Sequence, residues 1–256
     1  MTELHFSLPM INKGPKAKIF SSLSDKIIKI AVTDLPVLII GESGTGKEHM
    51  ARSIINASGR RNSNIIVVDL SSIPPNMLNT ELFGSIGDNS FYKGKLAPAD
   101  RGTILIKGIE NMPLATQTKL LNFMQHGFFC PEGTKTSRLA DVRIITTARR
   151  TFVEDVKTGR FSENLYKQIS RNTIYLSPVR TRQDDLKLII ERVMKHFAEK
   201  YHKKNIRMES EAMSKLINYE WPGNLREIES KLEKLVFLSE GNNINKENLL
   251  NFINIF

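Results

Sequence analysis

The chain has 256 residues, of which 40% are hydrophobic and 25% are charged, proportions typical of a soluble globular protein. Cys130 is its single cysteine, which excludes an intramolecular disulfide, and no apolar run approaches the roughly 18–20 residues that span a bilayer. Because the amino terminus also lacks the charged and apolar segments of a secretion signal, we expect a cytoplasmic protein with no membrane partner.

The net charge of +10 is spread unevenly along the chain. Before residue 181 there are 24 Lys/Arg and 15 Asp/Glu residues, whereas from there on there are 13 and 12. A basic surplus attracts nucleic acid and other phosphate-rich partners. It is also typical of a solvated basic face on a lysine-rich protein, and we favour that interpretation.

Short apolar runs alternate with helical periodicities along the first 180 residues. The predicted strands are 37–40, 65–70, 103–106, 142–147 and 173–176, and the predicted helices are 23–32, a segment after the glycine-rich turn 41–46, and 115–125. Strands that alternate with helices indicate parallel pairing, so we predict a layered α/β domain.

After Pro178 the apolar pattern is helical throughout. Helices are predicted at 184–201, 209–219, 225–239 and 246–252, with turns between them at 221–223 and 241–243. We therefore predict three parts, which are an N-terminal extension (1–20), an α/β core (21–180) and a helical domain (181–256).

A phosphate-binding loop is predicted between the first strand and the helix that follows it. The segment reads Gly41, Glu42, Ser43, Gly44, Thr45, Gly46, Lys47, Glu48, which is the glycine and lysine spacing of a P-loop. The glycines allow successive backbone N–H groups to face a phosphate, while the helix dipole and the lysine add positive charge. Glu48 replaces the Ser or Thr that usually binds Mg²⁺. The alternative is a loop that keeps this sequence but stays empty.

Further motifs follow this loop in order. They are IPPNMLNTELFG (73–84), QTKLLNFMQHGFF (117–129), DVRII (141–145), LSPVRTR (176–182) and WPGNLREIE (221–229). Together with GESGTGKE (41–48), they resemble the AAA+ domain of bacterial enhancer-binding proteins, the sigma-54-dependent transcription activators. The resemblance covers about Ile11 to Gly241. It implies an AAA+ P-loop NTPase core with a parallel sheet, followed by a small all-helical lid.

The resemblance also implies rings, commonly hexamers, that bind ATP between subunits and remodel the polymerase holoenzyme. In such proteins an Asp-Glu pair ends the third strand, holds Mg²⁺ and activates water, and this chain has Lys107-Gly108 there. Asp69 stands where the family has the asparagine that positions the catalytic glutamate. The Ile-Gly pair that the family uses near adenine is Ile11-Asn12. We therefore assign no catalytic and no metal-binding residue and expect ATP or ADP to bind with little need for Mg²⁺, Lys107 replacing part of the metal's charge.

The arginines of the family also differ. The two that would reach a neighbour's nucleotide align with Ser162 and Gln168, and the sensor asparagine aligns with Arg149. Arg160 lies close in sequence but is expected to point elsewhere. Arg226 in WPGNLRE matches the lid arginine that closes on nucleotide, so we add it to the loop residues 41–48 as a predicted nucleotide-binding residue.

The elements that contact other macromolecules are reduced. The segment SIGDNSFYKG (85–94) lacks the Gly-Ala-Phe-Thr-Gly-Ala motif with which the family contacts the sigma factor. The segment GNNINKENLLNFINIF (241–256) is too short for a helix-turn-helix, so we do not expect direct DNA binding by this chain. A homo-oligomer, or a partner that is a transcription regulator or the polymerase, is consistent with the resemblance.

Our leading hypothesis is a nucleotide-binding regulatory module of transcription, a pseudo-ATPase. Two alternatives come from other classes. One is an active ATPase with relocated groups, such as Glu110 or Asp100, and the other is a nucleotide-free scaffold or basic nucleic-acid binder. A signalling nucleotide, such as a cyclic dinucleotide, is a further candidate ligand for the loop.

Overall fold

The computed structural model describes residues 26–87, 90–203, 206–239, 241 and 243–253. They form two compact units. The first contains the described residues up to Gly41 and Lys47–Tyr175, and the second contains the loop Glu42–Gly46 and the described residues from Leu176 onward. The main part of the second unit thus starts at Leu176, and the predicted helical domain starts at residue 181. The N-terminal extension and the Ile11-Asn12 pair lie outside the described residues.

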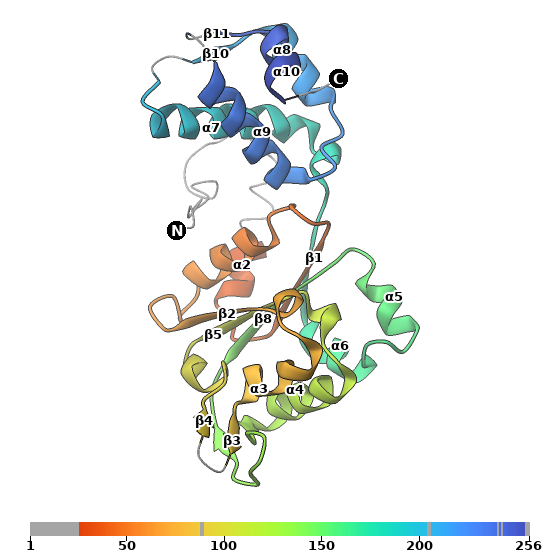
Figure 1. The fold of residues 1–256 in the computed structure, drawn as a ribbon. Coiled ribbons are helices and arrows are strands. Elements are labelled where there is room, and N and C mark those ends of the chain that lie inside the picture. The colour runs from red at the N-terminus through yellow and green to blue at the C-terminus, as the bar shows by residue number, and fades with distance from the viewer. Residues whose placement is uncertain (1–25, 88–89, 204–205, 240, 242, 254–256) are drawn as a thin grey trace. The chain divides into compact units, whose positions relative to one another are not determined.

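A five-stranded sheet in the order β2-β5-β8-β1-β9 organises the first unit (Figure 1). Its strands are β1 (Val37–Gly41), β2 (Ile65–Asp69), β5 (Thr103–Lys107), β8 (Arg143–Ala148) and β9 (Asn172–Leu176). The pairs β2–β5, β5–β8 and β8–β1 are parallel. The predicted α/β class with a parallel sheet is therefore confirmed, and each predicted strand is found within one or two residues of its expected ends.

Burial along the strands follows their order in the sheet. The inner strands β1 and β8 are buried at every position, whereas the edge strands β2 and β9 are only partly buried. Burial therefore depends on position in the sheet and not on apolar composition alone, since the edge strand β2 (IIVVD) is as apolar as the inner strand β1 (VLIIG). Alternate side chains, such as Leu38, Ile104 and Ile144, belong to one large hydrophobic core.

Helices and small hairpins complete the first unit. The helices are a segment at 26–31, α2 (Lys47–Asn56), α3 (Leu78–Phe83), α4 (Leu114–His126), α5 (Phe152–Lys157) and α6 (Glu163–Ile169), with 3-10 turns η1 (Leu70–Ser72), η2 (Pro75–Met77), η3 (Ala97–Ala99) and η4 (Ile109–Asn111). Two antiparallel pairs join β3 (Ser85–Gly87) to β4 (Ser90–Tyr92) and β6 (Phe128–Phe129) to β7 (Arg138–Leu139). The core contains residues of α3, α4 and α6.

The second unit is mainly helical, as predicted. It contains η5 (Val179–Thr181), α7 (Gln183–Lys200), α8 (Ser210–Asn218), α9 (Asn224–Leu238) and α10 (Lys246–Ile253), with a short parallel pair of β10 (Arg207–Met208) and β11 (Asn243–Ile244). Helices α7 and α9 pack together, and both carry fully buried side chains, which include Leu186, Ile190, Ile228 and Leu232. No helix in the described parts has the length and apolar composition needed to cross a bilayer.

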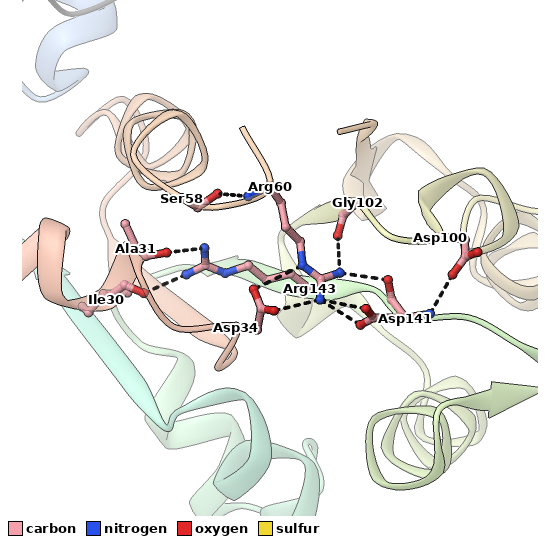
Figure 2. A network of polar contacts seen from close by, with 9 residues as sticks. All are labelled: Ile30, Ala31, Asp34, Ser58, Arg60, Asp100, Gly102, Asp141 and Arg143. Carbon is pink, nitrogen blue, oxygen red and sulfur yellow. Dashed lines mark hydrogen bonds and ion pairs between the residues drawn. The ribbon is translucent and has the colours of Figure 1, made fainter. Parts of the chain in front are cut away.

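Arg60 ties together the loops that enter the sheet at the amino ends of its strands (Figure 2). Its guanidinium donates to the carboxylates of Asp34 and Asp141 at 2.8–3.2 Å. It also donates to the carbonyl oxygens of Gly102 and Asp141 at 3.1 and 2.9 Å. These partners precede β1, β5 and β8, so one side chain fixes three strand entries. Because a P-loop lies at the carboxyl ends of the strands, we interpret this cluster as structural.

Arg143, the first residue of β8, fixes the helix at 26–31 in the same region. Its side chain is 1% exposed and donates to the carbonyl oxygens of Ile30 and Ala31 at 2.9 and 3.1 Å. The last carbonyls of a helix lack partners within the helix, and a cation stabilises that end. Burial lowers the pKa of Arg143, but an arginine stays charged at neutral pH.

We predict that Arg60→Ala lowers the free energy of unfolding by about 2 kcal/mol, because it removes several charge-assisted hydrogen bonds and leaves carbonyl groups unsatisfied. Urea unfolding followed by circular dichroism measures this change. The matched control is Arg61→Ala, since Arg61 is exposed and its loss is expected to change stability by less than about 0.5 kcal/mol.

The difference between wild type and Arg60→Ala is expected to depend on pH. The hydrogen bond from Arg60 holds the pKa of Asp34 below its ordinary value. A carboxylate with a lowered folded-state pKa contributes its stability above the unfolded pKa of about 3.9 and loses it as the pH falls through the folded value. The difference should therefore shrink below about pH 4. Equal stability of the two arginine variants at neutral pH would contradict this role.

Candidate functional site

The loop Glu42–Gly46 joins β1 to α2 in a tight turn. Gly44 and Gly46 have φ values of +74° and +91°, a left-handed conformation that is costly for residues with a Cβ. Thr45 is buried and its Oγ1 donates to the carbonyl oxygen of Glu42 at 2.8 Å. The glycine spacing predicted from the sequence is therefore required by the backbone itself.

Within the second unit, the loop is hydrogen-bonded to the turn that precedes α9. The N–H of Leu225 donates to the carbonyl oxygen of Gly44 at 2.9 Å, and Nδ2 of Asn224 donates to that of Ser43 at 3.0 Å. Arg180 donates two hydrogen bonds, of 2.8 and 2.7 Å, to the carboxylate of Glu42. The approach is close, because a Cβ at Gly44 would lie 2.1 Å from the carbonyl oxygen of Gly223.

Asn224 is the central residue of this turn. It is fully buried with φ +54°, and its Oδ1 accepts the N–H of Val179 at 2.9 Å. Trp221 is also buried with φ +47°, and its indole N–H donates to the carbonyl oxygen of Leu216. The buried Asn224 side chain, which is bonded to the backbone of Ser43 and of Val179, makes this turn a rigid support for the loop.

The predicted residue Arg226 lies in the first turn of α9, next to this support. It is exposed, and its Cβ would lie 3.4 Å from a Cβ added at Gly44. The second unit therefore brings Arg226 and the loop residues 42–46 together. Arg180 and Asn224 belong to motifs quoted in the sequence analysis but were not predicted as site residues, and the positive φ of Asn224 could not be seen in the sequence.

Lys47 and Glu48 begin α2 in the first unit. The Lys47 ammonium donates to the carbonyl oxygen of Gly41 at 2.7 Å, within the motif itself. The first N–H groups of a helix have no partner within the helix, and the N-terminal end of α2 therefore offers N–H donors and a positive dipole. Gly41, Lys47 and Glu48 are therefore held together at the carboxyl end of β1, where this class of fold binds ligands.

Four charged residues form an ion cluster at the carboxyl ends of β2 and β5. They are Glu48, Arg52, Asp69 and Lys107. The Lys107 ammonium is 3.2 Å from Oε2 of Glu48 and 3.0 Å from Oδ2 of Asp69. Arg52 donates to Oε1 of Glu48 at 2.9 and 3.2 Å. Asp69 and Lys107 are direct partners in the parallel β2–β5 pair, so the strand register brings these charges together.

The cluster is balanced and ionised at neutral pH. Burial raises the pKa of Asp69 and of Glu48, but the hydrogen bonds from Ser71 and Lys107 to Asp69, and from Arg52 and Lys107 to Glu48, outweigh it and lower both values. Burial lowers the pKa of Lys107, but the hydrogen bonds and charges of Asp69 and Glu48 raise it by more, so the net shift is upward. Two cations and two carboxylates leave no net charge.

These residues do not fit a bound Mg²⁺. Oδ1 of Asp69 accepts the N–H and the hydroxyl of Ser71 at 3.1 and 2.6 Å, so all four carboxylate oxygens of Glu48 and Asp69 already have a donor. Lys107 itself occupies the position between them. Elsewhere in the described ranges, no group of three or more His, Cys, Asp or Glu side chains could hold a metal ion.

The position after Lys107 is shaped by the backbone. Gly108 has φ +67°, and a Cβ there would lie 2.9 Å from Nδ2 of Asn111. Its N–H points to Oγ1 of Thr147 on β8 at 3.4 Å. The chain therefore turns sharply at the point where the family would place a glutamate, and a side chain there would be strained.

The arginines near the end of β8 are bound to a buried acid. Asp155 is 5% exposed and accepts hydrogen bonds from Arg149 at 2.9 and 2.7 Å, while Arg160 lies 2.8 Å from it. Ser162 caps α6, since its hydroxyl accepts the N–H of Leu165. Gln168 is half-buried on α6. Ser162 and Arg160 thus have structural contacts within the first unit.

The two acids considered as relocated catalytic groups lie at different edges of the sheet. Asp100 precedes β5 and accepts the N–H of Asp141, among the loops at the amino ends of the strands (Figure 2). Glu110 lies in η4, just after β5, and its Oε1 accepts the N–H of Arg149 at 3.2 Å. Its Oε2 is buried and has no hydrogen-bond partner within the described residues. Of the two, only Glu110 lies at the carboxyl-end edge of the sheet.

Family comparisons agree with the sequence motifs. Residues 14–175 match the family described as Sigma-54 interaction domain, and residues 180–254 match the AAA+ ATPase lid domain. The chain is 33% identical over 236 residues to the transcriptional regulatory protein XylR of Pseudomonas putida, which is 90% of this chain and 42% of XylR. It is 32% identical over 245 residues to the transcriptional regulatory protein ZraR of Salmonella typhimurium, which is 94% of this chain and 55% of ZraR.

Solved structures give the same result for the fold. The structure of NtrX from Brucella abortus in complex with ATP has a TM-score of 0.84 and 29% identity, over 91% of this chain and 52% of that one. NtrX in complex with ADP has a TM-score of 0.81, also with 29% identity, over 89% and 52% of the two chains. This chain therefore spans about half of the length of the proteins that it matches.

We predict that Gly44→Ala destabilises the protein by at least about 2 kcal/mol, because the new Cβ would meet the Gly223 carbonyl oxygen and the residue would have a positive φ. Hydrogen exchange should show faster exchange of the Leu225 amide, which donates to the Gly44 carbonyl. Gly59→Ala is the matched control, since a Cβ there has no atom within 4 Å. Equal behaviour of the two variants would disprove the close contact.

Proposed function

This chain belongs to the Sigma-54 interaction domain family of AAA+ proteins, and we propose that it is a nucleotide-binding regulatory module that holds ATP or ADP without hydrolysing it. The observation that carries the proposal is the loop 41–47, in which Gly44 and Gly46 have the left-handed conformations that a phosphate-binding turn needs. The crystal structures of NtrX with ATP and with ADP support the same ligands for this chain.

The chemistry at the end of β5 supports binding without hydrolysis. An AAA+ ATPase needs an acid that holds the metal and a base that activates water, and this chain has an ion-paired lysine and a glycine in a left-handed turn. A positioned general base contributes about 10²–10⁴ in rate. Its loss alone would leave very slow turnover.

The absence of the two family arginines that would reach a neighbour's nucleotide also supports binding without hydrolysis. An arginine finger contributes about 10³–10⁵ in rate, and the aligned residues are Ser162, which caps a helix, and Gln168. Arg160 is bound to Asp155. Although such losses do not simply add, each supports the proposal of a pseudo-ATPase.

We propose that nucleotide occupancy acts on transcription through a partner protein or through assembly with further copies. The relatives XylR and ZraR are transcriptional regulatory proteins, which supports a role in the same process. The loop 42–46 is bonded to the turn before α9, so a ligand on the loop would change the environment of the helical unit. A partner that reads this unit would respond to occupancy.

Slow ATP hydrolysis is a second candidate function, favoured by one observation. Oε2 of Glu110 is buried and has no hydrogen-bond partner in the described parts of the chain, and Glu110 follows β5 at the carboxyl-end edge of the sheet. A carboxylate in such a place could accept a proton from water. It is also bound to the N–H of Arg149, which gives it a structural role and favours the first candidate.

We expect ATP and ADP to bind the purified chain in isothermal titration, and Lys47→Ala to weaken both by at least about tenfold. The lysine ammonium is the side-chain charge of the motif that contacts phosphates. Lys187→Ala is the control, since Lys187 is exposed on α7, and should bind as the wild type does. An absence of heat with both nucleotides would remove the basis of the proposal.

Release of phosphate from ATP is expected to stay at the level of a buffer blank, measured with a coupled enzyme assay over several hours. Glu110→Gln and Lys47→Ala should give the same blank value, because neither would remove an existing activity. Phosphate release above the blank that Glu110→Gln abolishes would instead establish the second candidate.

A further inference from the structure

We infer that the nucleotide phosphates at Lys47 and the start of α2 are held without a divalent cation, because the Lys107 ammonium takes the metal's place as the resident counter-ion of Glu48 and Asp69. The inference rests on the proposed function and specifies its ligand as a metal-free nucleoside diphosphate or triphosphate. It is carried by the ion cluster of Glu48, Arg52, Asp69 and Lys107.

The cluster includes the residue next to the loop lysine. Residue 48 directly follows Lys47, and in a P-loop this residue supplies the side-chain oxygen that binds the metal. Here it is a glutamate, and its Oε2 is bound to the Lys107 ammonium at 3.2 Å. The glutamate in the place of this Ser or Thr is therefore bonded to Lys107, which stands where the family has the metal-binding aspartate.

The carboxylate oxygens of the cluster already have hydrogen-bond donors. Every carboxylate oxygen of Glu48 and Asp69 is occupied: Arg52 and Lys107 bind those of Glu48, and Ser71 and Lys107 bind those of Asp69. A divalent cation could gain these oxygens only by displacing the ammonium from both. Since two like charges repel at short distance, the cation and Lys107 would not share the place.

The residues of the cluster are held by regular secondary structure. Lys107 lies on the inner strand β5, and its backbone pairs with Asp69 on one side and Thr147 on the other. Arg52 holds Glu48 from one turn further along α2. Because both ends of the cluster are fixed by strands and a helix, the ammonium is a built-in charge, about one-third exposed, rather than a mobile surface lysine.

The test is a titration of the full chain with ADP and with ATP, in EDTA and again in excess Mg²⁺. We expect the Kd for ADP to differ by less than about threefold between the two buffers, and Mg²⁺ to bring no tightening for ATP. A loss of about tenfold or more in EDTA would overturn the inference and leave the proposed function standing. An absence of binding in both buffers would overturn both.

We expect Lys107→Asp to make nucleotide binding depend on Mg²⁺. It would place a third carboxylate beside Glu48 and Asp69, so nucleotide affinity in EDTA should fall by at least about tenfold and Mg²⁺ should restore part of it. Without nucleotide, Mg²⁺ should raise the melting temperature of this variant and leave that of the wild type unchanged. Lys135→Asp, at an exposed loop position, makes the same charge change and should behave as the wild type.

A second variant, which adds no carboxylate, keeps the test possible if Lys107→Asp does not fold. If Lys107→Asp does not fold, as judged by circular dichroism, Lys107→Met removes the ammonium with a side chain of similar length and should also weaken binding in EDTA. If a folded Lys107 variant binds nucleotide in EDTA as tightly as the wild type, the ammonium is not the counter-ion and the inference is wrong.

Discussion

Asp69 and Lys107 face each other at the ends of neighbouring parallel strands, because the register of β2 against β5 pairs these two residues. Glu48, at the start of α2, reaches the same ammonium from the helix that follows the loop. In a parallel α/β sheet this edge is where ligands bind. The ammonium at this edge neutralises carboxylates that would otherwise repel a phosphate, and it occupies the place between them that a metal ion would need.

The loop itself has a different support. Its backbone carbonyls accept hydrogen bonds from Leu225 and Asn224, and its glutamate pairs with Arg180. These partners all come from the mainly helical second unit, which therefore holds the loop residues in place. Hydrolysis requires groups on the sheet, whereas holding the loop requires the turn before α9. A chain could lose the first set and keep the second, as we propose here.

Much of the fold followed from patterns within short windows. The apolar run 37–40 and the glycine-rich turn after it predicted β1 and the loop, and the helical periodicities predicted α4, α7 and α9. The contacts of the site did not follow, because they join residues far apart in sequence. Arg60 meets Asp141, and Lys107 meets Asp69 only once the strands are paired in a definite register. The left-handed backbone of Asn224 gave no signal of its own in the sequence.

The central claim, that this chain binds a nucleoside triphosphate and leaves it intact, can be tested directly by analysing the bound ligand. The purified chain would be incubated with radiolabelled ATP, separated from free nucleotide by rapid filtration, and the retained nucleotide identified by ion-exchange chromatography. Our account predicts that the retained label is unhydrolysed ATP after prolonged incubation. Recovery of ADP with a matching amount of phosphate, or retention of no nucleotide, would contradict it.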